Sequence, residues 1–230
     1  MERIYFLHGF MGTAETHFRE QITGLEDKYE LILFDLPGHG TSSIETSENY
    51  FEDSLQYVIN QMKEKGEGYI LGLSLGASLA IHIAFREPEL VRGIILTGYT
   101  PFIPENMADI MAKQYEDFSK IEENNPDIAN HFRILHGDKW KRTLDCVNYT
   151  MTFHYPTATK EQIQNIKTPM LILNGSNELY EVEAAAYLKK MNNDTKIALV
   201  PDAGHTANID QPIIYNTILE HFLRRITNNI

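Results

Sequence analysis

The stretch Gly72-Leu73-Ser74-Leu75-Gly76 lies between the apolar run Tyr69-Ile70-Leu71 and a segment with helical periodicity. A strand, a sharp turn and a helix in this order expose a serine hydroxyl at the end of a buried strand. The turn forces Ser74 into a crowded backbone conformation, and residues as small as Gly72 and Gly76 avoid a clash between the strand and the helix. The pattern therefore predicts that Ser74 is a nucleophile.

A serine hydroxyl becomes a good nucleophile only when a base takes its proton. Among the nine histidines, His205 follows a strand-like apolar run at residues 196–200 and a turn-rich stretch at residues 201–204. Open α/β sheets place their functional groups in such loops, and Gly204 gives the backbone freedom to bring the imidazole into a cleft. We therefore predict that His205 is the base.

An acid that orients the imidazole is expected after another strand, between the serine and the histidine in chain order. The buried-strand pattern at residues 169–174 is followed by a glycine turn and Glu178, which we predict to be this acid. Glu181, Asp202 and Asp210 are the alternatives. Asp202 lies only three residues before His205, where it is better placed to shape the turn.

Four motifs in this order resemble the α/β-hydrolase superfamily over nearly the whole chain. Two are the serine and histidine segments above, and the others are residues 7–12 (Leu-His-Gly-Phe-Met-Gly) and residues 35–42 (Asp-Leu-Pro-Gly-His-Gly-Thr-Ser). The resemblance implies an oxyanion hole made by the backbone N–H groups of Phe10 and Leu75. It also implies that His8 and His39 anchor their turns by hydrogen bonds. Most members have aspartate where Glu178 stands.

Strand and helix patterns alternate along most of the chain, which predicts a mostly parallel sheet covered on both faces. The expected strands are residues 4–7, 30–35, 68–73, 93–97, 170–174 and 196–200, and the expected helices are residues 16–27, 47–65, 75–86, 181–191 and 211–227. The alternation breaks once, and we predict a helical cap insertion at residues 101–167 over a core formed by residues 1–100 and 168–230.

The predicted cap is rich in aromatic residues and methionine, which favours an apolar acyl or aryl substrate over a sugar or phosphate. We expect the substrate to be a small or medium apolar carboxylic ester, cleaved in two steps through an acyl-enzyme without cofactor or metal. Candidate pocket residues are Met11, Tyr99, Phe102, Trp140 and Phe153. The spacing of His131, His136 and His154 indicates no metal site, and His17, His82 and His221 lie in helix patterns without a functional signal.

The composition fits one packed domain of 230 residues with 43% hydrophobic content. A formal net charge of −12, from 32 acidic and 20 basic residues, opposes binding to nucleic acid or to an anionic membrane. Cys146 is the single cysteine, so no disulfide can form within the chain. The first residues pass directly into a strand pattern and no segment has transmembrane length, so we expect a cytoplasmic protein; nothing indicates its oligomeric state.

Three other readings are open. The motifs also resemble the menaquinone-pathway lyases of the same superfamily, which usually have Gly-Gly-Arg where this chain has Gly76-Ala77-Ser78. Cofactor-free haloperoxidases and perhydrolases usually have methionine where Leu75 stands. A non-catalytic ligand-binding protein on this fold would not need the serine, acid and histidine together.

Overall fold

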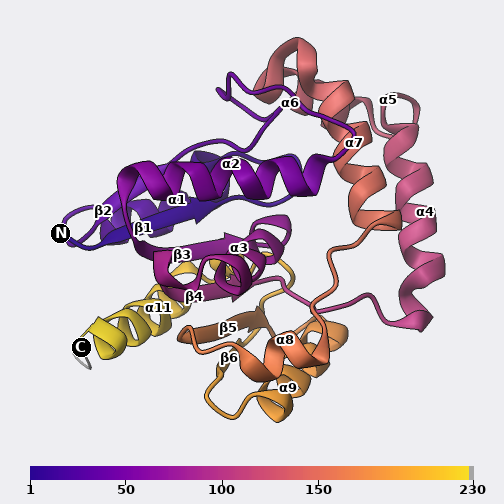
Figure 1. Ribbon diagram of the computed structural model, residues 1–230. Helices are drawn as coiled ribbons and strands as arrows, with labels where there is room; N and C mark the ends of the chain where they lie inside the picture. Colours follow the sequence, from indigo (N-terminus) through magenta and orange to yellow (C-terminus); the bar gives the residue numbers. More distant parts are fainter. Residues whose placement is uncertain (228–230) are drawn as a thin grey trace.

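The strands form a single parallel sheet in the computed structural model, which describes residues 1–227 (Figure 1). The strands are β1 (Arg3–Leu7), β2 (Glu30–Leu33), β3 (Gly68–Leu73), β4 (Val91–Thr97), β5 (Met170–Gly175) and β6 (Lys196–Val200). Their order in the sheet is β2-β1-β3-β4-β5-β6, with every neighbouring pair parallel. The chain therefore changes direction across the sheet between β1 and β3, and the loops after these two strands meet at the point where such sheets bind ligands.

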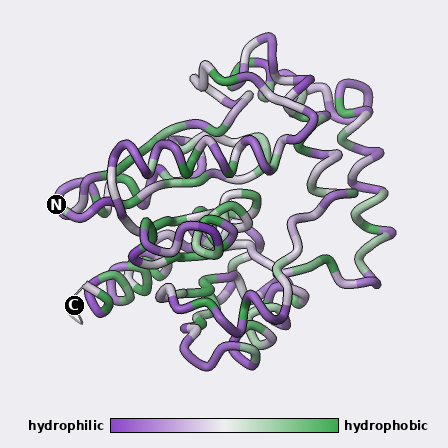
Figure 2. The backbone as a smooth tube through the Cα atoms, viewed as in Figure 1, coloured by the Kyte–Doolittle hydropathy of each residue, from purple (hydrophilic) through white to green (hydrophobic). Residues whose placement is uncertain are grey.

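Helices cover both faces of the sheet and are α1 (Ala14–Leu25), α2 (Tyr50–Lys65), α3 (Leu75–Arg86), α9 (Leu179–Met191), α10 (Ala207–Asp210) and α11 (Pro212–Thr227), with a short 3₁₀ turn η1 (Pro88–Leu90). One core cluster joins the sheet to α2, α3 and α9, and a second joins its other face to α1 and α11. Burial of the strands is nearly continuous in the middle of the sheet, and Figure 2 shows hydrophobic colour concentrated there. The predicted fold class is confirmed.

The predicted elements are all present, with small shifts at their ends. β2 ends at Leu33 and not at residue 35, and α9 begins at Leu179, two residues earlier than expected. The short helix α10, directly after the histidine loop, was not predicted.

The segment between β4 and β5 is helical and has no strand in the structure of residues 98–169. It contains α4 (Ala108–Ser119), α5 (Ile121–Asn124), α6 (Pro126–His136), α7 (Trp140–Phe153) and α8 (Lys160–Asn165), with 3₁₀ turns η2 (Glu105–Met107) and η3 (Gly137–Lys139). Figure 1 shows α4 to α7 at the end of the molecule toward which the strand arrows point. We call α4 to α7 the cap; it has its own small apolar cluster, which includes Phe132, Trp140 and Leu144.

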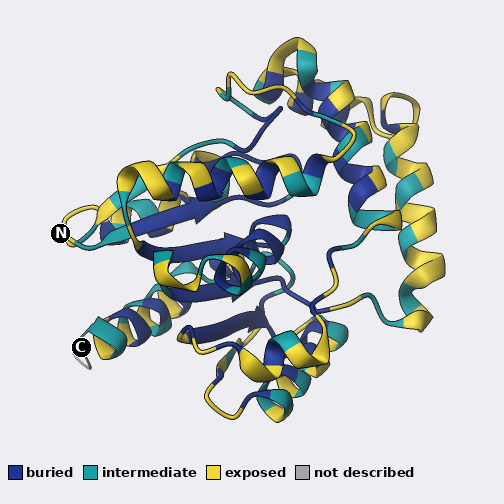
Figure 3. Cartoon of the chain, viewed as in Figure 1, coloured by how far each residue is buried: buried dark blue, intermediate teal, exposed yellow. Residues whose placement is uncertain are grey.

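The cap is unevenly packed. α7 buries six residues, whereas α4 buries none, and Figure 3 shows α4 only in the exposed and intermediate colours. Hydrogen bonds attach α7 to the turn after β2: the Thr143 hydroxyl donates to the Gly38 carbonyl at 2.9 Å and also lies 2.9 Å from the Thr46 hydroxyl. Helix α7 is therefore fixed to the sheet domain, and α4 is held less firmly.

Helix α3 approaches β1 so closely that no side chain fits between them. A Cβ atom on Gly76 would lie 1.9 Å from the Leu7 carbonyl oxygen, and one on Gly72 would lie 2.4 Å from the Gly76 carbonyl oxygen. Both contacts are with backbone atoms, which cannot relieve a clash by changing rotamer as a side chain can. The two glycines that the sequence pattern singled out are therefore a steric condition for the turn.

We expect Gly76→Ala to destabilise the protein by about 3 kcal/mol or more, because the new methyl group must separate α3 from β1. The measurement is the melting temperature and the midpoint of urea unfolding. Gly24→Ala in α1 is the matched control, since there the nearest atom is the side-chain nitrogen of Asn216 at 3.2 Å. Equal stability of Gly76→Ala and the wild type would contradict the steric argument.

Candidate active site

Ser74 lies at the turn between β3 and α3 in a conformation that residues other than glycine rarely adopt. Its φ is 55° and its ψ is −112°, at the N-cap of α3. The Ser74 amide donates to the Thr97 carbonyl of β4 at 2.8 Å, and its carbonyl accepts from the amides of Ala77 and Ser78. Because these bonds hold the strained turn, the half-buried Ser74 side chain is presented at the carboxyl edge of the sheet.

His205 lies in the loop after β6 and reaches the same edge. A Cβ atom on Gly98, directly after β4, would lie 2.7 Å from the His205 carbonyl oxygen and 2.8 Å from its Cε1. The Ser74 amide bonds to Thr97, and the imidazole of His205 lies against Gly98, the next residue in the chain. Ser74 and His205 are therefore held by neighbouring residues at the end of β4. Asp210 holds the loop through the Gly204 amide at 2.8 Å and the Thr206 hydroxyl at 3.1 Å.

The carboxylate that contacts His205 is Glu181, and the prediction of Glu178 is wrong in this respect. His205 Nδ1 lies 2.5 Å from Glu181 Oε1, and the Glu181 side chain is completely buried. Glu178 is half-buried at the N-cap of α9, and its side chain has no hydrogen bond in the structure of residues 1–227. The physical reason is the early start of α9: one helical turn carries position 181 inward under the histidine loop. Glutamate is long enough to span that distance.

The contact with Glu181 decides both the tautomer and the charge preference of His205. Because Nδ1 faces a carboxylate oxygen, which accepts a hydrogen bond, Nδ1 carries the proton and Nε2 has a free lone pair. Burial disfavours the imidazolium, but the hydrogen bond to Glu181 and the charges of Glu181, Glu178 and Asp210 outweigh it and raise the pKa of His205. Glu178 therefore contributes charge to the site without touching the ring.

The backbone near Ser74 offers free N–H donors. The Gly9 amide donates to His17 and the Gly12 amide donates to Gly9, whereas Phe10, Met11 and Leu75 have amides without an acceptor among residues 1–227. A Cβ atom on Gly9 would lie 3.4 Å from the Cβ of Ser74, so Phe10 follows a residue in contact with the nucleophile. Leu75 is the first residue of α3, whose positive helix end also favours a negative oxygen.

His8 and His39 have the anchoring contacts that the resemblance implied. His8 Nδ1 donates to the Gly9 carbonyl at 2.9 Å, and its Nε2 accepts from the Leu36 amide at 2.9 Å. His39 Nδ1 donates to the Pro37 carbonyl at 3.1 Å. Burial lowers the pKa of His8 to about 4 and also lowers that of His39. Both imidazoles are therefore neutral hydrogen-bonding groups.

The five candidate pocket residues have different surroundings. Met11 and Trp140 belong to the buried cluster of the cap, and Tyr99 is completely buried in the core. Phe102 stacks edge-on against Tyr187 of α9, and Phe153 is 52% exposed between Tyr115 and Tyr149. These contacts are packing contacts, and substrate contact by any of the five stays a prediction.

Asp202 has a φ of 57° and is exposed, in keeping with a role in the turn. Within residues 1–227, no group of three or more His, Cys, Asp or Glu residues could hold a metal ion. None of the helices in that part of the chain is long and apolar enough to cross a membrane.

Sequence reasoning missed two histidines that lie at the site. His17 of α1 accepts the Gly9 amide, and His136 of α6 contacts the Met11 carbonyl. His17 has no local sequence signal, because it occupies an ordinary position in a helix pattern. His136 comes from the cap, and only the folded structure brings it to the loop after β1.

Comparison with known proteins agrees with this fold. The model of the Alpha/beta hydrolase family matches residues 4–215. The crystal structure of NosK from Streptomyces actuosus has a TM-score of 0.91 and 31% identity, covering 98% of this chain and 99% of that one.

Among curated proteins, the pimeloyl-[acyl-carrier protein] methyl ester esterase of Nitrosospira multiformis is 25% identical over 87% of this chain and 86% of its own length. A putative 2-succinyl-6-hydroxy-2,4-cyclohexadiene-1-carboxylate synthase of Bacillus subtilis is 24% identical over 98% of this chain and 91% of its own length. The chain is also 24% identical, over 97% of its own length, to protein PHYLLO of Arabidopsis thaliana, of which it spans 15%.

We expect the imidazole of His205 to titrate with a pKa above 6.5, because its carboxylate neighbours stabilise the charged form. The measurement is an NMR titration of the histidine side chains, with the His205 signals assigned from a His205→Asn variant. Glu178→Gln should lower the midpoint slightly and Glu181→Gln should lower it more, since only Glu181 touches the ring. A larger effect of Glu178→Gln would contradict the assignment of the contact.

Proposed function

The chain belongs to the alpha/beta hydrolase family, and we propose that it is a serine esterase that cleaves a small or medium apolar carboxylic ester through an acyl-enzyme. The observation that carries the proposal is the contact of His205 with the buried Glu181 carboxylate, at the same sheet edge as a serine in the strained turn after β3. An imidazole that a carboxylate orients, at the same sheet edge as a half-buried serine hydroxyl, is the arrangement that activates a nucleophile.

The first step forms the acyl-enzyme. His205 Nε2 takes the proton of the Ser74 hydroxyl as Ser74 Oγ attacks the ester carbonyl, and Glu181 stabilises the imidazolium that results. The carbonyl oxygen becomes an oxyanion, which the amides of Phe10 and Leu75 stabilise. His205 then gives the proton to the leaving alcohol, and the bond between the carbonyl carbon and the alcohol oxygen breaks.

The second step releases the acid. His205 removes a proton from a water molecule, which attacks the acyl carbon, and the oxyanion forms again at the same amides. The proton returns to Ser74 Oγ as its bond to the acyl group breaks. Apart from the ester and the water molecule, both steps use groups of this chain.

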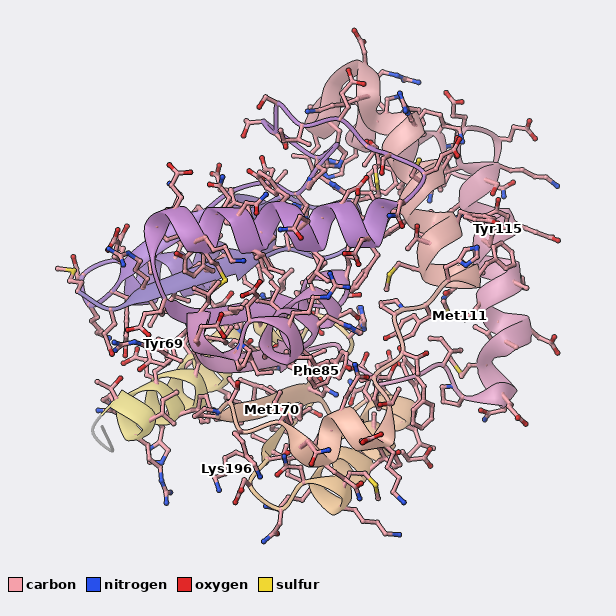
Figure 4. The ribbon with its side chains drawn as sticks, in the orientation of Figure 1. Tyr69, Phe85, Met111, Tyr115, Met170 and Lys196 are labelled. Carbon is pink, nitrogen blue, oxygen red and sulfur yellow. The ribbon has the colours of Figure 1, made fainter. Side chains whose placement is uncertain are left out.

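The inner face of α4 supports an apolar substrate. Figure 4 shows Met111 and Tyr115 on the side of α4 that faces the rest of the molecule. Further along the helix, the ring of Phe118 lies 5.0 Å from that of Phe10 in the loop beside the nucleophile. These side chains are only partly buried, so an acyl chain placed against them would gain hydrophobic contact.

A lyase is the second candidate, because the Bacillus subtilis relative is named as a putative synthase of a cyclohexadiene carboxylate. The position at which those enzymes usually carry arginine holds Ser78, which is buried here and has no hydrogen-bond partner among residues 1–227. A cytoplasmic location is also part of the proposal, supported by the single free cysteine.

We expect a fluorophosphonate probe to label Ser74, and a panel of p-nitrophenyl esters of graded chain length to be hydrolysed. Ser74→Ala should lose labelling and about 10³-fold or more in turnover, because no other group can form the acyl bond. Mass spectrometry of the labelled peptide and initial rates are the measurements. Turnover of the menaquinone-pathway intermediate with inert esters would favour the lyase instead, and labelling at another serine would refute the assignment of the nucleophile.

Glu181 and Glu178 provide a matched pair for testing the acid. Glu181→Gln should lower kcat by about 10² to 10⁴, because the amide cannot stabilise the imidazolium. Glu178→Gln should change kcat by about threefold or less, since that side chain supplies only a distant charge. Steady-state kinetics and melting curves measured in parallel separate catalysis from stability. A larger loss of kcat in Glu178→Gln than in Glu181→Gln would instead support Glu178 as the acid, as predicted from the sequence.

A further inference from the structure

The loop at residues 9–12, which contains Phe10, has few hydrogen bonds of its own. Its one internal backbone bond, from the Gly12 amide to the Gly9 carbonyl, is 3.3 Å long. Met11 has a φ of 50°, a conformation that costs a residue with a side chain about 1 kcal/mol or more. The direction of the Phe10 amide must therefore depend on contacts from outside the loop.

One of these contacts comes from the cap. His136, at the end of α6, is 1% exposed and lies between the two loops after β1 and β2. Its Nδ1 accepts from the Gly40 amide at 2.9 Å, so Nε2 carries the proton and donates to the Met11 carbonyl at 3.1 Å. Both nitrogens are therefore satisfied by a single tautomer, and the strained residue of the loop is bonded to a cap helix.

The second contact comes from α1. His17 Nδ1 accepts from the Gly9 amide at 3.0 Å, which removes that N–H as a rival donor to an oxyanion. The ring lies directly against the loop, since a Cβ atom on Gly12 would be 2.1 Å from its Cε1, 2.2 Å from its Nε2 and 2.5 Å from its Nδ1. Asn208 Nδ2 donates to the His17 carbonyl at 2.6 Å, next to Phe18, whose φ of −130° departs from helical geometry. The helix is therefore kinked and bonded where it supplies this imidazole.

We propose that His17 and His136 are positioning residues that hold the loop at residues 9–12 so that the Phe10 amide is aimed at the oxyanion, with His136 coupling the cap to the oxyanion hole. The inference rests on the proposed acyl transfer at Ser74. It assigns each imidazole a different end of the loop, His17 the Gly9 amide and His136 the Met11 carbonyl.

Three substitutions at position 136 separate its two hydrogen bonds. A glutamine nitrogen can occupy the place of Nε2 and donate to Met11, whereas an asparagine oxygen can occupy the place of Nδ1 and accept from Gly40 only. Leucine can do neither. We therefore compare His136→Gln, His136→Asn and His136→Leu, with His131→Gln on the exposed side of α6 as the control.

The readout specific to the oxyanion is inhibition by butylboronic acid, whose adduct with Ser74 places a boron-bound oxygen where the oxyanion forms. In His136→Asn and His136→Leu, we expect its inhibition constant to rise and kcat to fall by about tenfold or more each. In His136→Gln and His131→Gln, both quantities should change by about threefold or less. Inhibition by 1-butanol, which has the same alkyl chain but places no negatively charged oxygen at these amides, and KM should change little. Equal inhibition by the boronic acid in His136→Asn and the wild type would overturn the proposal. It would also be overturned if His136→Gln, His136→Asn and His136→Leu lost inhibition and kcat equally, in proportion to their fall in melting temperature.

Position 17 gives an independent test if the variants at position 136 do not fold. His17→Asn keeps an acceptor for the Gly9 amide and should retain boronic acid inhibition to within about threefold, whereas His17→Leu should lose about tenfold. Equal inhibition in the two variants would overturn the role of His17. Fluorophosphonate labelling separates this inference from the function itself: failure to label Ser74 in the wild type refutes the acyl transfer, whereas labelling at equal rates in wild type, His136→Leu and His17→Leu refutes the positioning roles alone.

Discussion

The contact between α3 and β1 at Gly76 is the constraint on which the site depends. Because the helix lies directly against the Leu7 carbonyl, the loop after β1 is brought beside the turn that carries Ser74. Similar close approaches occur at Gly98, against His205, and at Gly175, where a Cβ atom would lie 2.2 Å from the carbonyl oxygens of Ala203 and Gly204. Three positions without side chains thus draw together the ends of β1, β3, β4, β5 and β6. Side chains from different strands can come together at this edge only because glycine at these three positions lets the backbones approach so closely.

The histidines near the ends of these strands differ in the direction of their pKa shift. Burial lowers the pKa of His8, His17, His39 and His136, and for His17 the value falls to about 3. His205 is the exception within this group, because it alone touches a carboxylate. At neutral pH the first four are fixed neutral groups whose tautomers are set by backbone partners, and His205 is poised to accept a proton. Environments that separate the pKa values of like groups in this way assign their roles.

The fold, the place of Ser74 in the turn after β3 and the place of His205 in the loop after β6 could be predicted because each depends on local pattern. Gly72, Gly76 and the alternation of strands and helices carry their meaning within a few residues. The acid could not be chosen from the sequence with the same success. Whether position 178 or 181 faces His205 depends on where α9 begins, and a shift of two residues at a helix start turns the side chains by more than half a turn. His17 and His136 were out of reach because their roles arise from contacts between segments far apart in the chain.

The two parts of the cap differ in how they are attached to the site. α6 and α7 are bonded to the loops after β1 and β2 through His136 and Thr143, whereas α4 has no buried residue and meets the site through Phe118. Moving α6 would break hydrogen bonds that support the strained Met11 peptide, and moving α4 would separate partly exposed apolar side chains. Moving α4 costs less free energy than moving α6, because it breaks no hydrogen bond to the loop at residues 9–12 and separates less buried surface. A displacement of α4 would therefore leave the hydrogen bonds of His17 and His136 to the loop at residues 9–12 intact.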